Sequence, residues 1–238
     1  MEGRAVSILA VPSATYVWDW STVLSVQSLE IIGGGLLYTL FVSVLALVFG
    51  NVIGLAVASV RMSGRQPFSG LAYVYIEFFR TTPALVQLIW IFYVLPILFN
   101  ISLGPIEAGV IALSLNAGAF LAEIFRGGIQ SVPSGQRDAS FVLGLSRPTT
   151  FWSIVFPQAV RSMLPATGNV FVSLVKDSSL LSVIAVPELT YQAQQLATST
   201  FRPLEVYTLL AVTYFIVAFP LTRAVGRLEK RLRKSSIR

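Results

Sequence analysis

The ionisable side chains that interrupt apolar segments are the residues of this sequence most able to do chemistry. Glu77 and Arg80 are three residues apart, so on a helix they would share one face and could neutralise each other. Lys176 and Asp177 are adjacent and would point in different directions. An ionisable group in a membrane helix costs several kcal/mol unless it is paired or faces water. We therefore expect Lys176 to find a partner on another helix, or Asp177 to line an aqueous cavity.

The absence of histidine and cysteine narrows this chemistry. Catalytic triads, Cys–His nucleophiles, disulfides, and imidazole or thiolate metal sites are all excluded. We expect no catalytic residue and no metal site in this chain.

The elements that must position these side chains are membrane spans. Of the 238 residues, 55% are hydrophobic and 12% are charged, against about 25% charged in a typical soluble domain. The first apolar segment alone would form a helix roughly 37 Å long, enough to cross a bilayer core of about 30 Å. We predict an all-α polytopic membrane protein with five transmembrane helices, the second one long helix disturbed near Pro83, at about residues 36–60, 69–99, 107–125, 162–186 and 206–222.

The basic residues orient the predicted spans. Thirteen of the 17 lie in segments that follow the first, third and fifth spans, all on one side of the membrane. The positive-inside rule makes that side cytoplasmic. We read the net charge of +6 as a topology signal and expect no nucleic-acid partner. The prediction is an external N-terminal tail at 1–32, a transmembrane domain at 33–225, and a basic cytoplasmic tail at 226–238.

The longest polar segment, residues 127–160, separates the third and fourth spans and exceeds the length that a connector needs. Ser134 can cap a short helix that ends at Gly144. Ser146 can cap a second helix, which would present Phe151, Trp152, Ile154 and Val155 before Pro157 stops it. A cytoplasmic helix–glycine–helix with exposed aromatic residues is either a docking surface or a hairpin on the lipid headgroups. The residues alone leave both open.

This loop resembles the EAA loop of the permease subunits of ABC importers. Asp138, Ala139 and Ser140 stand in the place of Glu-Ala-Ala, Gly144 follows four positions later, and residues 154–157 (Ile-Val-Phe-Pro) stand in the place of Ile-x-Leu-Pro. Three residue types differ from the pattern and the spacing is intact. From about Gly33 onward the chain is similar to the polar amino acid uptake permeases, such as the histidine, glutamine and arginine permease subunits, in residues 33–40, 77–88, 122–136 and 164–184.

The resemblance implies a type I ABC-importer permease in a bacterial inner membrane, not an enzyme. The chain would form half of a channel with a copy of itself or a homologue. An external binding protein would deliver the amino acid, and residues 188–200 can form an external helix to meet it. A dimer of ATPase subunits would dock on the coupling residues Asp138, Ala139, Ser140, Gly144, Ile154, Phe156 and Pro157.

The lysines support the expectation that ATP is bound by a partner chain. A phosphate-binding P-loop needs Gly-Lys-Ser/Thr, and none of Lys176, Lys230 and Lys234 follows a glycine. We therefore expect no cofactor in this chain, with ATP and Mg²⁺ bound by the partner.

An amino-acid substrate carries an ammonium and a carboxylate, so its pathway needs polar groups of both kinds. We expect the pathway to be lined by Glu77, Arg80, Thr82, Gln87, Asn116, Lys176, Asp177, Ser178 and Ser179. Alternatively, such side chains only join neighbouring helices through hydrogen bonds. An ion-coupled transporter that uses Glu77, Glu123 or Asp177, or a non-transporting scaffold, are the other functions considered. The sequence does not select one amino acid.

Overall fold

The computed structural model describes residues 16–235, with side chains to residue 232, and within them the chain is helical with no strand. Residues 1–15 of the predicted external tail and residues 236–238 lie outside the described part. The α-helices are α1 (Trp20–Val23), α2 (Val26–Met62), α3 (Phe68–Thr81), α4 (Ala84–Ile89), α5 (Leu95–Phe99), α6 (Pro105–Gln130), α7 (Ser134–Val142), α8 (Arg147–Thr150), α9 (Phe156–Asp177), α10 (Leu189–Thr200) and α11 (Pro203–Ser235). Two π-helical turns, η1 (Trp90–Val94) and η2 (Phe151–Val155), and a 3₁₀ helix, η3 (Ser178–Ile184), complete the set.

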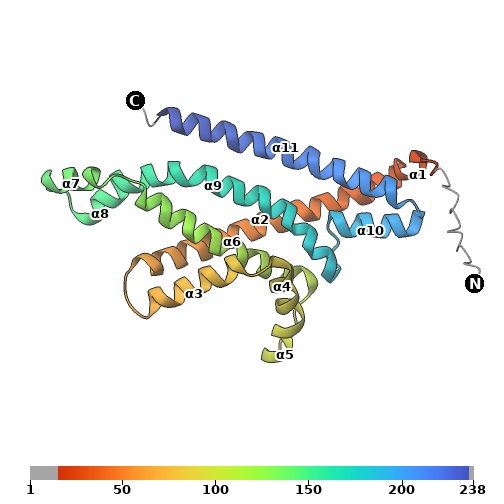
Figure 1. Cartoon of the computed structure of the whole chain (residues 1–238), viewed down its shortest axis with the longest axis horizontal. Helices are drawn as coiled ribbons and strands as arrows, with labels where there is room; N and C mark the ends of the chain where they lie inside the picture. Colours follow the sequence, from red (N-terminus) through yellow and green to blue (C-terminus); the bar gives the residue numbers. More distant parts are fainter. Residues whose placement is uncertain (1–15, 236–238) are drawn as a thin grey trace, which may run out of the picture.

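Three of these helices, α2, α6 and α11, are long and apolar enough to cross a membrane. Two bent pairs, Phe68–Thr81 with Ala84–Phe99 and Arg147–Ile184 with Leu189–Thr200, raise the number to five if each pair forms one span. The all-α prediction is confirmed, with three to five candidate spans. The long helices lie side by side, with α7 and α8 at one end of the molecule and α1 and α10 at the other (Figure 1).

The prediction of one long helix over residues 69–99, disturbed near Pro83, is wrong in one respect: the disturbance is a complete break. The axes of α3 and α4–α5 meet at 109°, and the segment α4–α5 projects from the body of the molecule (Figure 1). At the break, Thr82 has ψ 144° and Pro83 has ψ 132°, both extended. Proline disfavours the α conformation in the residue before it and has no N–H to donate, so the helix stops instead of kinking.

The prediction that Pro157 stops a helix is also wrong. The chain passes from α8 through η2 directly into α9, and Pro157 lies in the first turn of α9. The π-helical turn η2 lies directly before Pro157, and it lets the helix continue past a residue that has no N–H to donate. Other boundaries shift as well: α2 begins at Val26, inside the predicted tail, α9 gives way to a 3₁₀ helix at Ser178, and α11 continues to Ser235.

The core is built where α2 crosses α6. Gly54 of α2 lies so close to α6 that a Cβ at this position would be 2.7 Å from the Cβ of Leu121. A second glycine one turn earlier, Gly50, meets Ala117 in the same way, at 3.1 Å. Small residues that allow close backbone approach are the usual basis of helix packing in membranes. The α2–α6 pair is therefore closely packed, and α3 and α9 pack against it.

At the opposite end from α7 and α8, α10 is fixed by its first residues. The Glu188 carboxylate accepts hydrogen bonds from the backbone N–H groups of Thr190 at 2.9 Å and Tyr191 at 2.8 Å, and from the Tyr214 hydroxyl at 3.2 Å. The N–H of Leu189 donates to the hydroxyl oxygen of Thr39 on α2 at 3.2 Å. The predicted helix over residues 188–200 is confirmed, and these bonds join it to α2 and α11.

Candidate functional site

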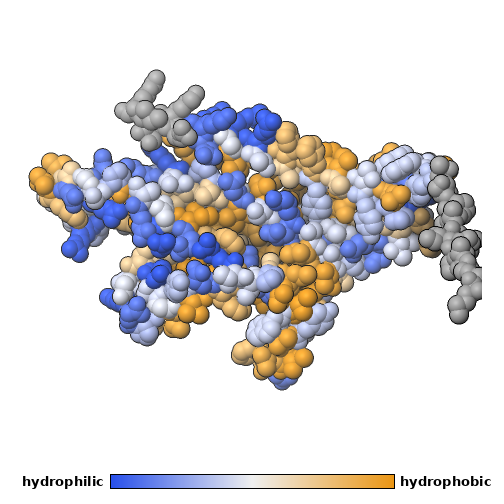
Figure 2. All heavy atoms as spheres, in the orientation of Figure 1, coloured by the Kyte–Doolittle hydropathy of each residue, from blue (hydrophilic) through white to orange (hydrophobic). Residues whose placement is uncertain are grey.

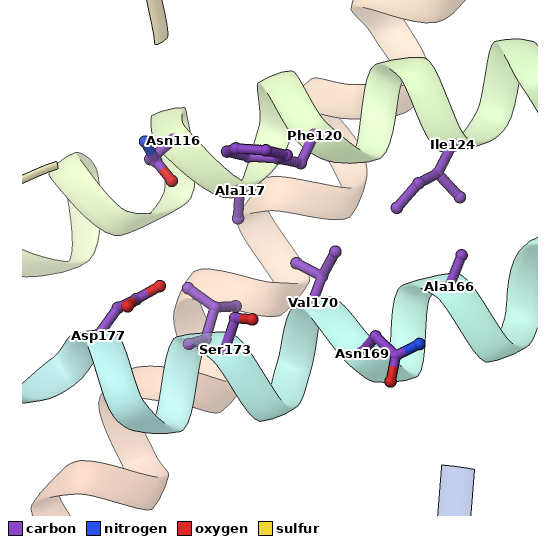
Figure 3. Close-up of a pocket in the computed structure, with 10 residues that line it drawn as sticks. Asn116, Ala117, Phe120, Ile124, Ala166, Asn169, Val170, Ser173 and Asp177 are labelled. Atoms are coloured by element: carbon purple, nitrogen blue, oxygen red, sulfur yellow. The ribbon is translucent and has the colours of Figure 1, made fainter. Parts of the chain in front are cut away.

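A cavity of about 360 Å³ opens between α6 and α9. On α6 the lining residues Asn116, Phe120 and Ile124 recur every four residues, and so do Asn169, Ser173 and Asp177 on α9. Residues four apart lie on one face of a helix, so each helix contributes one row of side chains (Figure 3). The remaining lining residues are Ala117, Ala166, Val170 and Leu174.

The polar groups of the cavity are few. Among its ten lining residues Asp177 alone is charged, and Asn116, Asn169 and Ser173 add two amides and a hydroxyl. Asp177 is the last residue of α9, where the helix tightens into η3. An otherwise apolar cavity with a few convergent polar groups is the common form of a small-molecule site.

The break between α3 and α4 lies beside this cavity and is stabilised by two amide side chains. Nε2 of Gln87 donates to the carbonyl oxygens of Phe79 and Thr82, both at 3.0 Å, and to the Thr82 hydroxyl at 2.7 Å. Nδ2 of Asn116 donates to the Phe79 carbonyl at 3.1 Å and to Oε1 of Gln87 at 3.0 Å. These bonds supply partners for carbonyl groups at the end of α3, among them that of Phe79, whose helical partner would be Pro83, a residue without an N–H. The sequence prediction grouped Thr82, Gln87 and Asn116, and the structure joins them directly.

The predicted pairing of Glu77 with Arg80 is confirmed, although it is loose. The nearest nitrogen and oxygen are 3.9 Å apart, and the side chains are 39% (Arg80) and 42% (Glu77) exposed. The Arg80 guanidinium also lies 5.6 Å from the ring centre of Phe120, which lines the cavity. Neither Glu77 nor Arg80 lines the cavity itself.

Thr82 and Gln87 lie at the break and do not line the cavity, and neither do three other predicted pathway residues. Lys176 is exposed and forms no ion pair with any residue that the structure describes, so the expectation of a partner on another helix is not met there. Ser178 is fully buried and donates to the carbonyl of Val175 at 2.9 Å. Ser179 is half-buried in η3. The sequence prediction missed Asn169 and Ser173. They lie eight and four residues before Asp177 on one helix, and this spacing was a usable signal.

The polar loop forms a compact helix–turn–helix. Gly144 has a φ of +75°, a conformation that favours glycine, and it turns the chain between α7 and α8. The Ser140 hydroxyl is buried, donates to the Arg137 carbonyl at 2.6 Å, and lies 2.9 Å from the Thr150 hydroxyl of α8. The Ser146 side chain caps α8 by accepting from the N–H of Thr149, as predicted. The loop therefore has one defined shape.

Exposed apolar side chains gather at the end of α7, in a loop whose other exposed residues are largely polar. Val142 is 87% exposed and Leu143 is 78% exposed, and they belong to the hydrophobic patch at the tip of α7 (Figure 2). Exposed apolar side chains at this end of the molecule fit either role that the sequence leaves open, a docking surface or a hairpin on lipid headgroups. Of the predicted coupling residues, Asp138, Ala139, Gly144, Phe156 and Pro157 are exposed, Ile154 is half-buried and Ser140 is buried.

Two details of the loop depart from the sequence prediction. Val155, expected to be presented at the surface, is 4% exposed and packs with Val132, Ala159 and Met163. Val142 and Leu143 were not among the predicted coupling residues. The run of three apolar residues from 141 to 143, on a helix otherwise rich in polar residues, was the signal that could have found them.

Comparison with known proteins adds relatives of established type. The chain is 40% identical over 217 residues to the glutamine transport system permease protein GlnP of Escherichia coli K12, covering 91% of this chain and 98% of that protein. It is 40% identical over 203 residues to the L-cystine transport system permease protein TcyB of Bacillus subtilis, covering 85% and 86% of the two chains.

A solved structure described as an amino acid ABC transporter with histidines superposes with a TM-score of 0.85 at 35% identity, covering 91% of this chain and all of that one. The fold is therefore that of a type I ABC-importer permease, and the expected resemblance is confirmed. Residues 50–234 match the model of binding-protein-dependent transport system inner membrane components. The chain belongs to this family of ABC-importer permease subunits, which are transport proteins and not enzymes.

Proposed function

We propose that this chain forms the pathway by which a polar amino acid crosses a bacterial inner membrane, driven by a separate ATPase. The observation that carries the proposal is the cavity between α6 and α9, whose one charged lining group is the carboxylate of Asp177. A single negative group amid apolar walls suits the ammonium that every amino acid carries. The named substrates of the relatives, glutamine and cystine, are amino acids of this kind.

The orientation that we propose has five spans, the N-terminus outside and the C-terminus in the cytoplasm. The end of α11 lies at the same end of the molecule as α7 and α8 (Figure 1), which agrees with the basic residues shared by these segments. Each of the two bent pairs then counts as one span, and α10 lies on the external side, where a binding protein would dock.

The partners follow from surfaces that the single chain leaves uncovered. The coupling surface, which comprises the predicted coupling residues with Val142 and Leu143, would receive the ATPase dimer, and that dimer would bind ATP and Mg²⁺. Asp177 is partly exposed in the single chain, and a carboxylate cannot face lipid cheaply. A second permease subunit, this chain again or a homologue, would close the pathway around it.

Reconstitution tests the proposal. The chain would be purified with its ATPase, inserted in proteoliposomes, and supplied with its binding protein and a panel of radiolabelled amino acids. We expect uptake of a polar amino acid. This uptake should require ATP in the compartment where the coupling loop lies, and it should continue after ion gradients are collapsed. Uptake that follows a proton or sodium gradient without ATP would instead identify an ion-coupled transporter and overturn the proposal.

A further inference from the structure

The hydrogen bonds at the α3–α4 break determine which way two side-chain amides point. An amide has a donor nitrogen and an acceptor oxygen. Gln87 is 5% exposed, and one end of its amide faces the carbonyl oxygens of Phe79 and Thr82. Because carbonyl oxygens only accept, this end must be the nitrogen. The oxygen of Gln87 therefore points at Asn116.

The orientation of Asn116 follows from the same logic. Its amide meets the oxygen of Gln87 at 3.0 Å and the carbonyl oxygen of Phe79 at 3.1 Å, both acceptors. Both N–H groups of Asn116 are thereby used at the break. The only atom of this amide left for the cavity is its oxygen, Oδ1. Figure 3 shows this oxygen on the side of Asn116 that faces α9.

We infer that Asn116 Oδ1 and the carboxylate of Asp177 form an acceptor-only subsite that binds the primary ammonium of the transported molecule, with Gln87 as its positioning residue. The two residues reach toward each other from α6 and α9 at the same end of the cavity (Figure 3). An ammonium has three donors and no acceptor, so it suits a pair of acceptors of which one is charged. This inference rests on the proposed function.

The other polar groups of the cavity are not restricted to accepting hydrogen bonds. Ser173 and Asn169 each carry both a donor and an acceptor, and the described structure holds neither in a hydrogen bond that uses up its donors. They can serve the remainder of the substrate, whatever its polarity. The Asn116–Asp177 end is thus the end that rejects an anion, and the sequence alone gave no way to tell which face of Asn116 would be offered.

The test measures recognition of the ammonium as a ratio of two affinities, so that a change in overall affinity does not affect it. The permease–ATPase complex, without the binding protein, is loaded in nanodiscs with L-glutamine or with 4-carbamoylbutanoate, the same molecule without its α-amino group, and both dissociation constants are measured. We expect the intact complex to bind L-glutamine at least about tenfold more tightly, the worth of one charge-assisted hydrogen bond. Equal affinities, or no binding of either, would overturn the inference.

Two variants and a control locate the effect. Asn116→Leu removes the acceptor, and we expect the ratio of affinity for L-glutamine to affinity for 4-carbamoylbutanoate to fall about tenfold. Gln87→Leu releases the Asn116 amide so that its N–H groups can turn into the cavity, and we expect the same ratio to fall about threefold or more. Asn51→Leu is the matched control, because among the described residues Nδ2 of Asn51 bonds the carbonyl of Leu47 on its own helix and no other group; the ratio should be unchanged.

The ratio also separates recognition from damage to the fold. A purely structural role for Asn116 would weaken both ligands equally and preserve the ratio in folded Asn116→Leu and Gln87→Leu, which overturns the inference. If Asn116→Leu does not elute as a folded complex, Gln87→Leu decides the result alone. Failure of the proposed function would appear elsewhere, as an absence of ATP-driven uptake by the unmodified protein.

Discussion

Replacement of Gly144 by alanine tests whether the shape of the coupling loop matters for transport. Gly144 has φ +75°, and a Cβ built there meets no atom within 4 Å. The substitution therefore adds backbone strain and no clash. A left-handed conformation costs an L-residue roughly 1–2 kcal/mol, which lowers the population of the native loop shape about 5- to 30-fold relative to its distorted forms. We expect substrate-stimulated ATP hydrolysis to fall by up to this factor, with the membrane helices intact.

The matched control is Gly135→Ala in the same loop. Gly135 lies within α7, its φ is not in the left-handed region, and a Cβ there also meets nothing within 4 Å. ATP hydrolysis and amino-acid uptake would be measured for both variants in nanodiscs and proteoliposomes, with gel filtration to verify assembly. Full coupled transport by Gly144→Ala, or equal impairment by Gly135→Ala, would refute the reasoning.

Three further changes probe the pathway, the docking surface and the frame. Asp177→Asn should lower amino-acid uptake about tenfold or more, because a charge-assisted bond is worth about 1.5–3 kcal/mol; unchanged uptake across an amino-acid panel would contradict this. Leu143→Asp should reduce ATPase co-purification about tenfold, since burying an exposed leucine (78% here) contributes about 1.5–3 kcal/mol; retained co-purification would remove Leu143 from the interface. Gly54→Ala should cost about 1–3 kcal/mol of stability through its 2.7 Å approach to Leu121, measured by thermal unfolding, whereas Gly34→Ala, with nothing within 4 Å, should be neutral.

The sequence was sufficient for those features that depend on local chemistry. Apolar length predicted the long helices, Gly144 predicted the turn in the loop, and Ser146 predicted the cap of α8. The angle at Pro83 was not predictable in this way. It depends on amides that replace the lost helical bonds, and one of them, Asn116, comes from a helix 37 residues further along the chain.

The candidate site was predictable only in part, for a similar reason. Asn116 and Asp177 are polar interruptions of apolar segments and were found as such. Ser178 is also a polar interruption of an apolar segment, yet its hydroxyl donates to the backbone carbonyl of Val175 close by in the chain. Which polar residue faces a cavity depends on how α9 is rotated against α6, and rotation is decided by packing between helices distant in sequence.

The two faces of α9 have a consequence for how such proteins diversify. Asn169, Ser173 and Asp177 line the cavity, while Val172 and Val175, on other faces of the same helix, are 7% and 0% exposed within the packed core. Asn169 and Ser173 are exposed in the single chain, so substitutions there need not disturb the buried valines. If the cavity binds the substrate as proposed, single substitutions at these two positions could change its preference at little cost in stability.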